Sequence, residues 1–215
     1  MNTSKENILV AGANGTTGKK IVSYVKESQY YNPVAMVRKE EQREQFKIQD
    51  IDTVLGDLEE DLSHVVEGID KVIFAAGSGG KTGPDKTTAV DQEGAKSLID
   101  VSKNAGIKKF VMLSSINADK PESGGELQHY LEAKKNADDH LKQSGLLYSI
   151  VRPGTLKDEE GTRKINAAHK VEHGKITRDD VAYTLVHVLN DDIAQNAVFE
   201  MTEGEERIED AIKQF

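Results

Sequence analysis

Short apolar runs alternate with longer amphipathic segments along the first 150 residues of the chain. Several runs are continuously apolar, which is typical of strands buried on both faces of a parallel sheet. We expect strands at Ile8–Ala11, Val34–Val37, Thr53–Leu55, Lys71–Ala75, Phe110–Leu113 and Tyr148–Val151. The segments between them carry apolar residues at helical spacing. This spacing predicts helices over Thr16–Ser28, Asp91–Ala105 and Tyr130–Ser144.

The last third of the chain is less regular. The motif Thr-Arg-Asp-Asp at 177–180 resembles a helix start, and the pattern predicts a strand at Ala197–Met201 and a short helix at Glu205–Lys213. No repeat or linker marks a second domain. Alternation of strands and helices predicts an α/β fold, a doubly wound parallel sheet of the Rossmann type. We expect a single domain with its core in 1–154, while 155–215 complete the sheet and the substrate side.

The sequence GANGTTG at 12–18 joins the first predicted strand to the first predicted helix. In a dinucleotide-binding loop the first glycine permits a tight turn, the second lets pyrophosphate approach the backbone, and the third lets the helix pack closely. Free N–H groups and the positive dipole at the helix N-terminus then favour phosphate. We therefore predict cofactor contacts by Gly12, Asn14, Gly15, Thr16, Thr17 and Gly18.

The second predicted strand ends in Arg38. An NAD-binding Rossmann domain usually carries a carboxylate about 20 residues beyond the loop, where it binds the ribose 2′-hydroxyl. An arginine at this place instead pairs with a 2′-phosphate. Glu40 and Glu41 follow at once, so the sequence favours NADP(H) and leaves NAD(H) open.

The composition of the chain mainly excludes certain kinds of chemistry and partner. The chain has 215 residues, no cysteine and a net charge of −9, which excludes disulfides and thiolate chemistry and argues against nucleic acid or an anionic membrane as partner. The run Ile8–Ala11 is too short for a signal peptide, and we expect a soluble cytoplasmic protein. His169 and His173 stand four apart without an evident third ligand, so we expect a surface pair and no metal. The oligomeric state stays open.

Further pieces of the chain resemble one family. They follow the later predicted strands and are VLGDL at 54–58, FAAG at 74–77, VMLSS at 111–115, VRPG at 151–154 and ITRDDVA at 176–182. With the Gly-x-x-Gly-x-x-Gly loop, they resemble a small atypical short-chain dehydrogenase/reductase of the NmrA-like, NAD(P)H-binding group, often labelled NAD-dependent epimerase/dehydratase-like. The resemblance implies further cofactor contacts by Asp57, Leu58, Ala75, Ala76, Gly77, Pro153 and Gly154.

Tyr130 and Lys134 stand at i and i+4, on one face of a predicted helix. In the superfamily that the chain resembles, a Tyr-x-x-x-Lys pair does the proton chemistry beside the nicotinamide, and the lysine also binds the nicotinamide ribose. A phenol has a pKa of about 10, so a nearby ammonium is needed to favour its ionised form. The resemblance implies that Ser115, with Ser114 as the alternative, binds the substrate oxygen. A buried tyrosine beside a solvated lysine is the non-catalytic alternative.

The resemblance implies an NADP(H)-dependent oxidoreductase that transfers hydride to a small carbonyl, quinone or flavin-like acceptor. A redox sensor without turnover and a sugar epimerase or dehydratase are the alternatives, although the segment after Gly154 is short for enclosing a nucleotide-sugar. The substrate stays open, because the residues that would read it lie in irregular segments: Ser78–Pro84, Asn117–Gln128 and Leu156–His173. We expect the first two segments to be more mobile than the sheet and to become ordered on ligand binding.

Overall fold

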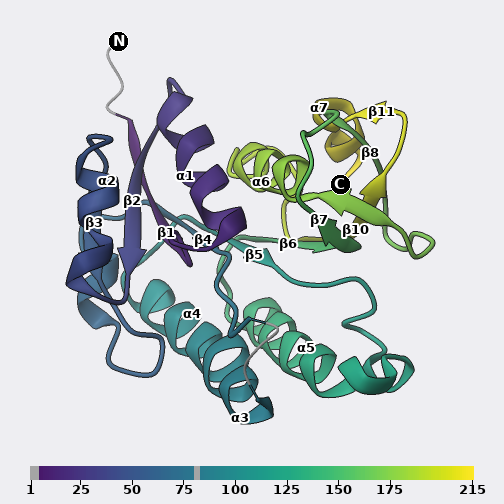
Figure 1. Cartoon of the computed structure of the whole chain (residues 1–215), viewed down its shortest axis with the longest axis horizontal. Coiled ribbons are helices and arrows are strands. Elements are labelled where there is room, and N and C mark those ends of the chain that lie inside the picture. Colours follow the sequence, from purple (N-terminus) through teal and green to yellow (C-terminus); the bar gives the residue numbers. More distant parts are fainter. Residues whose placement is uncertain (1–4, 80–82) are drawn as a thin grey trace.

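Strands and helices alternate in the computed structural model of the chain, which describes residues 5–79 and 83–215. The main sheet contains β1 (Glu6–Ala11), β2 (Tyr31–Val37), β3 (Asp52–Leu55), β4 (Lys71–Phe74), β5 (Lys109–Leu113), β6 (Tyr148–Pro153), β8 (Lys164–Ala168), β10 (Ala197–Glu203) and β11 (Glu206–Arg207). Within the described ranges their order is β11-β8-β10-β6-β5-β4-β1-β2-β3 (Figure 1). Neighbours from β3 to β10 are parallel, whereas β8 is antiparallel to β10 and to β11. A smaller parallel pair consists of β7 (Thr155–Lys157) and β9 (Lys175–Thr177).

Helices cover both faces of the sheet (Figure 1). One face carries α1 (Thr16–Glu27), α6 (Arg178–His187) and α7 (Ile208–Ala211), and the other carries α4 (Ala95–Asn104) and α5 (Gln128–Gln143). Shorter helical segments are α2 (Glu44–Lys47), α3 (Pro84–Lys86) and a π-helical turn, Thr87–Gly94, between α3 and α4. The order β3-β2-β1-β4-β5-β6 with helices on both faces confirms the predicted Rossmann-type fold. No helix in the described ranges has the length and apolar character needed to cross a membrane.

The first strand shows why these strands have continuous apolar runs. Ile8 and Val10 belong to the apolar cluster under α1 and α6, whereas Leu9 and Ala11 belong to the cluster under α4 and α5. All four side chains are fully buried. Because helices cover both faces, an alternating polar pattern would bury polar groups without partners.

Departures from the predicted elements lie mostly in the C-terminal part. The helix predicted over Asp91–Ala105 begins earlier, because the π-helical turn precedes α4. The helix predicted over Glu205–Lys213 is wrong in its first half, because Glu206 and Arg207 pair with β8 as β11. The sequence pattern does not predict β8 itself, since its five residues include an exposed lysine and an exposed asparagine.

The start of α6 agrees with its motif. The Thr177 hydroxyl accepts a hydrogen bond from the Asp180 amide at 2.9 Å, so the predicted helix start at 177–180 is confirmed. The irregular segment Asn117–Gln128 contains short 3₁₀ turns, and 80–82 of the segment Ser78–Pro84 lie outside the described residues. The greater mobility of both segments stays a prediction.

Two buried lysines hold the chain that follows α6. Lys71 and Lys109 are paired at the first positions of β4 and β5 and are almost fully buried. Lys109 Nζ donates to the carbonyls of Asn190 and Ile193 at 2.8 and 2.7 Å, and Lys71 Nζ donates to the Leu189 carbonyl at 3.0 Å. These carbonyls belong to the turns that follow α6, where buried backbone groups need partners, and the two ammonium groups supply the donors. Burial disfavours the charged form and lowers the pKa of Lys109 to about 8.

Lys109→Met should change how stability depends on pH. The folded lysine loses its proton near pH 8, whereas the unfolded lysine keeps it to about pH 10.4. Between these values the unfolded state binds more protons, so Lys109 raises the free energy of unfolding by up to about 3 kcal/mol as pH rises. Urea unfolding of both proteins from about pH 7 to about pH 10 tests this. The free energy of unfolding of the parent protein, relative to that of Lys109→Met, should increase with pH. A difference that stays constant with pH would contradict the lowered pKa of Lys109.

Candidate cofactor pocket and active site

The turn between β1 and α1 is packed backbone against backbone. Gly12 has a φ of 88°, and a Cβ there would lie 2.6 Å from the Ala76 amide nitrogen. A Cβ on Gly18 would lie 2.0 Å from the Gly12 carbonyl oxygen. These two positions have the tight turn and the close helix packing that the loop predicts. Among the residues that the structure describes, no side chain caps the N-terminus of α1 at Gly15, so its first amides are available to an anion.

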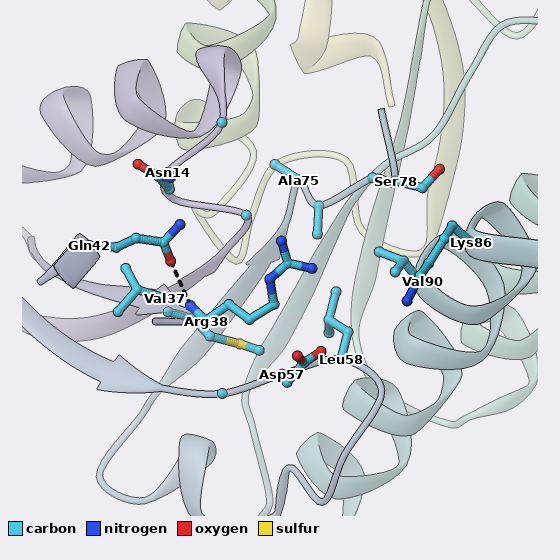
Figure 2. Close-up of a pocket in the computed structure, with 16 residues that line it drawn as sticks. Asn14, Val37, Arg38, Gln42, Asp57, Leu58, Ala75, Ser78, Lys86 and Val90 are labelled. Carbon is cyan, nitrogen blue, oxygen red and sulfur yellow. Dashed lines mark hydrogen bonds between the residues drawn. The ribbon is translucent and has the colours of Figure 1, made fainter. Parts of the chain in front are cut away.

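A cavity of about 400 Å³ lies at the carboxyl ends of β1, β2, β3 and β4 (Figure 2). Nine predicted cofactor residues line it: Gly12, Asn14, Gly15, Arg38, Asp57, Leu58, Ala75, Ala76 and Gly77. The cavity lies at the point where the strand order reverses around β1, which is where open α/β sheets bind ligands. The structure therefore brings residues from four separate loops to one site.

Other lining residues were missed by the sequence reasoning: Met36, Val37, Gln42, Gly56, Ser78, Lys86 and Val90. Several directly precede or follow predicted contacts at strand ends, and that position was the available signal. Lys86 and Val90 come from the helical segments after the glycine-rich stretch, where the sequence shows no marker for the cavity.

Six predicted cofactor contacts lie outside the cavity lining: Thr16, Thr17, Gly18, Lys134, Pro153 and Gly154. Thr17 and Gly18 are buried behind the loop in the first turn of α1. Gly154 has a packing role, because a Cβ there would lie 2.3 Å from the Gly174 carbonyl oxygen. Any cofactor contact by these six residues stays a prediction.

Arg38 extends its guanidinium into the cavity (Figure 2). Its backbone amide is held by the Gln42 side chain, whose Oε1 accepts that hydrogen bond at 3.0 Å. Within the described residues the guanidinium makes no ion pair, whereas Lys86 pairs with Glu59 at 2.7 Å. Arg38 therefore presents to the cavity a cation that has no ion-pair partner among the described residues.

The Tyr130–Lys134 pair lies on α5, outside the residues that line the cavity. Lys134 Nζ is 5.6 Å from the centre of the Tyr130 ring. Lys134 is only 4% exposed, so the alternative of a solvated lysine is wrong. Its Nζ lies 3.0 Å from Oδ1 of Asp91, a buried carboxylate on the π-helical turn. Burial opposes the charged form, but Tyr130 and Asp91 outweigh it and raise the pKa of Lys134.

Asp91 also links this pair to the cavity. Its Oδ2 accepts a hydrogen bond from the backbone amide of Ser78 at 2.8 Å, and Ser78 lines the cavity. Single π-helical turns inside helices are frequent at functional sites. The sequence does not predict the role of Asp91, because no sequence pattern predicts a π-helical turn or the contact between Asp91 and Lys134.

Ser114 and Ser115 have different surroundings at the end of β5. The Ser114 hydroxyl is buried and donates to Oδ2 of Asp138 at 2.9 Å. The Ser115 hydroxyl is partly exposed and donates only to the adjacent Ile116 carbonyl, at 3.3 Å. This geometry favours Ser115 as the serine that can reach a substrate, and that role stays a prediction.

The two histidines lie on an exposed, non-helical segment. His169 is close to the Val198 carbonyl and packs against the Phe215 ring, while His173 lies 3.5 Å from the Thr155 hydroxyl. Within the described residues, no three metal-binding side chains are grouped as a metal ion would require.

Residues 12–192 match the family model described as NAD(P)H-binding. The chain belongs to this NAD(P)H-binding family. It is 42% identical over 210 residues to the uncharacterized sugar epimerase YhfK of Bacillus subtilis, covering 96% of this chain and 98% of that protein. A putative NAD-dependent epimerase/dehydratase from Bacillus halodurans has a TM-score of 0.91 and 40% identity, covering 98% of this chain and all of that one.

A more distant relative is named as a reductase. Sanguinarine reductase of Eschscholzia californica is 26% identical over 265 residues, covering 99% of this chain and 94% of that protein. Together the comparisons place the chain among NAD(P)H-binding oxidoreductases of the atypical short-chain dehydrogenase type, as the sequence predicts. The chain therefore belongs to a family that binds a nicotinamide cofactor, and the cavity has the position expected for it.

Asp91→Asn should destabilise the protein by about 3–5 kcal/mol, because it leaves a buried, uncompensated ammonium. Adding Lys134→Met removes that ammonium and should recover most of the loss. Urea unfolding of the parent, both single variants and the double variant closes the cycle. Strictly additive losses would show that the two groups do not interact.

Proposed function

We propose that this protein is an NADPH-dependent reductase whose acceptor is a small carbonyl, quinone or flavin-like molecule. The observation that carries the proposal is Arg38, whose guanidinium extends into a Rossmann cofactor cavity and has no ion-pair partner in the described part of the chain. A phosphate pairs well with such a fork of donors, and the adenosine 2′-phosphate is what distinguishes NADPH from NADH. Exposed Glu40 and Glu41 follow Arg38, but neither lines the described cavity.

The pair on α5 supports reduction of a carbonyl. NADPH, held by the 12–18 loop and Arg38, would supply the hydride that the carbonyl carbon accepts. The Tyr130 hydroxyl donates its proton to the carbonyl oxygen, which Ser115 orients through a hydrogen bond. Lys134, held next to the tyrosine ring by burial and by Asp91, stabilises the phenolate that remains.

The shape of the chain after β6 supports a small acceptor. Residues 154–215 are used for the sheet edge and for the helices that cover it, in particular β8, β10, α6 and α7. Within the described residues no separate layer covers the site, so a nucleotide-sugar would be poorly enclosed. This favours reduction of a compact molecule over the epimerase chemistry named for some relatives.

The second candidate is a sensor that binds NADP(H) without turnover. One observation favours it: Lys134 is buried and already paired with Asp91, and within the described residues neither Tyr130 nor Lys134 lines the cavity. In this arrangement the lysine would have to leave its carboxylate to bind the ribose.

Arg38→Ser should weaken NADPH binding by about 1.5–3 kcal/mol, the range for a hydrogen bond to a charged group, which is about 10- to 150-fold in Kd. NADH binding should change little, since NADH lacks the 2′-phosphate. Lys39→Ser is the matched control, because Lys39 is the adjacent exposed cation and does not line the described cavity. Calorimetric titration of each variant with both cofactors is the measurement. Equal losses for NADPH and NADH would refute the role of Arg38.

Tyr130→Phe removes one hydroxyl, so NADPH affinity should persist while turnover falls by about 10²–10⁴, the usual share of general acid catalysis. The assay follows NADPH oxidation with a panel of carbonyls, quinones and flavins. Tyr30→Phe, at an exposed tyrosine outside the described cofactor cavity, serves as the control. Full activity in Tyr130→Phe would remove the proton-donor role and leave direct hydride transfer, as to a flavin. Binding without turnover in the parent protein would favour the sensor.

A further inference from the structure

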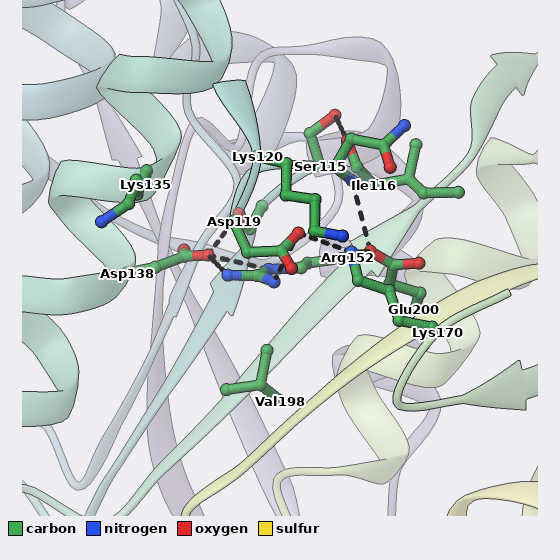
Figure 3. A network of polar contacts seen from close by, with 12 residues as sticks. Ser115, Ile116, Asp119, Lys120, Lys135, Asp138, Arg152, Lys170, Val198 and Glu200 are labelled. Carbon is green, nitrogen blue, oxygen red and sulfur yellow. Dashed lines mark hydrogen bonds and ion pairs between the residues drawn. The ribbon is translucent and has the colours of Figure 1, made fainter. Parts of the chain in front are cut away.

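A network of charged side chains, buried at its centre, lies beside the candidate active site, at the carboxyl ends of β5 and β6 (Figure 3). It joins α5, the loop after β5, β6, β10 and the loop before β9. Its side chains are Ser114, Asp119, Asp138, Arg152, Lys170 and Glu200. The proposed mechanism uses none of these groups.

Asp138 is the centre of the network. It is fully buried, and its Oδ2 accepts three hydrogen bonds, from Arg152 Nε at 3.0 Å, from Arg152 Nη2 at 2.9 Å and from the Ser114 hydroxyl at 2.9 Å. Its Oδ1 has no partner within the described residues. Burial raises the pKa of Asp138, against the opposing effect of Arg152. One carboxylate oxygen thus fastens α5 to the ends of two neighbouring strands.

The outer part of the network fastens two loops. Glu200, fully buried on β10, accepts hydrogen bonds from the Asn117 and Val171 amides at 3.2 Å each and from Lys170 Nζ at 2.7 Å. Lys170 also pairs with Asp119, whose carboxylate lies 3.6 Å from Arg152. The loop after β5, which carries Ser115, is therefore held from both sides.

Stability alone does not account for this arrangement. Burying two charges costs several kcal/mol per ion, and a well-packed apolar pair of similar size is often as stable or more stable. What the charges provide is a defined geometry: Asp138 stands one turn after Lys134 and two turns after Tyr130, on the same face of α5. Its bonds to Ser114 and Arg152 set the position of that face against the loop of Ser115.

We propose that Asp138 is a positioning residue, which uses Arg152 and Ser114 to hold Tyr130 and Ser115 in register across the candidate active site. This inference rests on the proposed reductase function. It predicts a loss of turnover without a loss of cofactor affinity, because the cavity at β1–β4 lies outside the network.

The test uses Asp138→Asn together with Arg152→Met, since Asp138→Asn alone leaves a buried unpaired arginine, which is strongly destabilising. The double variant removes both charges, so its unfolding midpoint should stay near that of the parent. Turnover should fall at least tenfold and the NADPH Kd should change less than twofold. Amide exchange of 114–120 in the cofactor-free protein should become at least tenfold faster. Ser114→Ala, which removes one bond and unpairs no charge, should shift turnover and exchange in the same direction to a smaller extent.

A matched control is Arg163→Met with Asp180→Asn, which removes another arginine–aspartate pair with a fully buried carboxylate, between the 161–163 loop and α6. It should leave turnover and exchange of 114–120 unchanged. Parental turnover in the Asp138/Arg152 double variant would overturn the positioning role, as would unchanged exchange of 114–120. If none of the carbonyls, quinones and flavins supports NADPH oxidation by the parent protein, the proposed reductase function fails. The exchange result alone then decides whether Asp138 holds the loop.

Discussion

The close packing of the β1–α1 turn against the end of β4 is the contact on which the rest of the site depends. Gly12 and Gly18 leave no room for a side chain at this contact, so the first turn of α1 starts at the edge of the sheet. Its amides then open towards the point where the strand order reverses, and the ends of β2, β3 and β4 complete a cavity around them. A larger residue at either glycine would move the helix away from the cavity that it helps to form.

Charge is distributed differently in the two halves of the site. The cofactor cavity contains the guanidinium of Arg38, which pairs with no carboxylate in residues 5–79 and 83–215 and is suited to a dianionic group arriving from solution. On the β5 and β6 side the charges are buried in pairs, with Lys134 held by Asp91 and Arg152 held by Asp138. A buried charge without a partner is strongly destabilising, so these pairs constrain where their helices and strands can lie. One half is thus open to a charged ligand, and the other has a fixed geometry suited to chemistry.

The parts of this structure that sequence predicts are those encoded locally. The parallel strands are predicted because burial on both faces leaves continuous apolar runs, as in Ile8–Ala11. The place of the glycine loop is predicted because a phosphate-binding turn directly follows the first strand. The place of Arg38 is predicted because the residue near the ribose follows the second strand. Thr177 is predicted as a cap because the helix start needs an acceptor within three residues.

The parts that sequence does not predict depend on contacts between distant segments. Asp91 meets Lys134 only because a π-helical turn faces α5, and Asp138 meets Arg152 only when α5 lies on β6. In the sequence, each of these four residues looks like an ordinary charged residue of a helix or strand. β8 and the edge strand β11 are short, and their pairing depends on the neighbouring strand, β10 for β8 and β8 for β11. Gly154 is predicted to contact the cofactor, but in the structure its lack of a side chain allows close packing against Gly174.

A crystal structure with NADP⁺ bound tests the account most directly. The account predicts the pyrophosphate at the amides of the 12–18 loop, the 2′-phosphate within hydrogen-bond distance of Arg38, and the nicotinamide between Ser115 and Tyr130. A cofactor whose 2′-phosphate points away from Arg38, or whose nicotinamide lies out of reach of Tyr130, would contradict it.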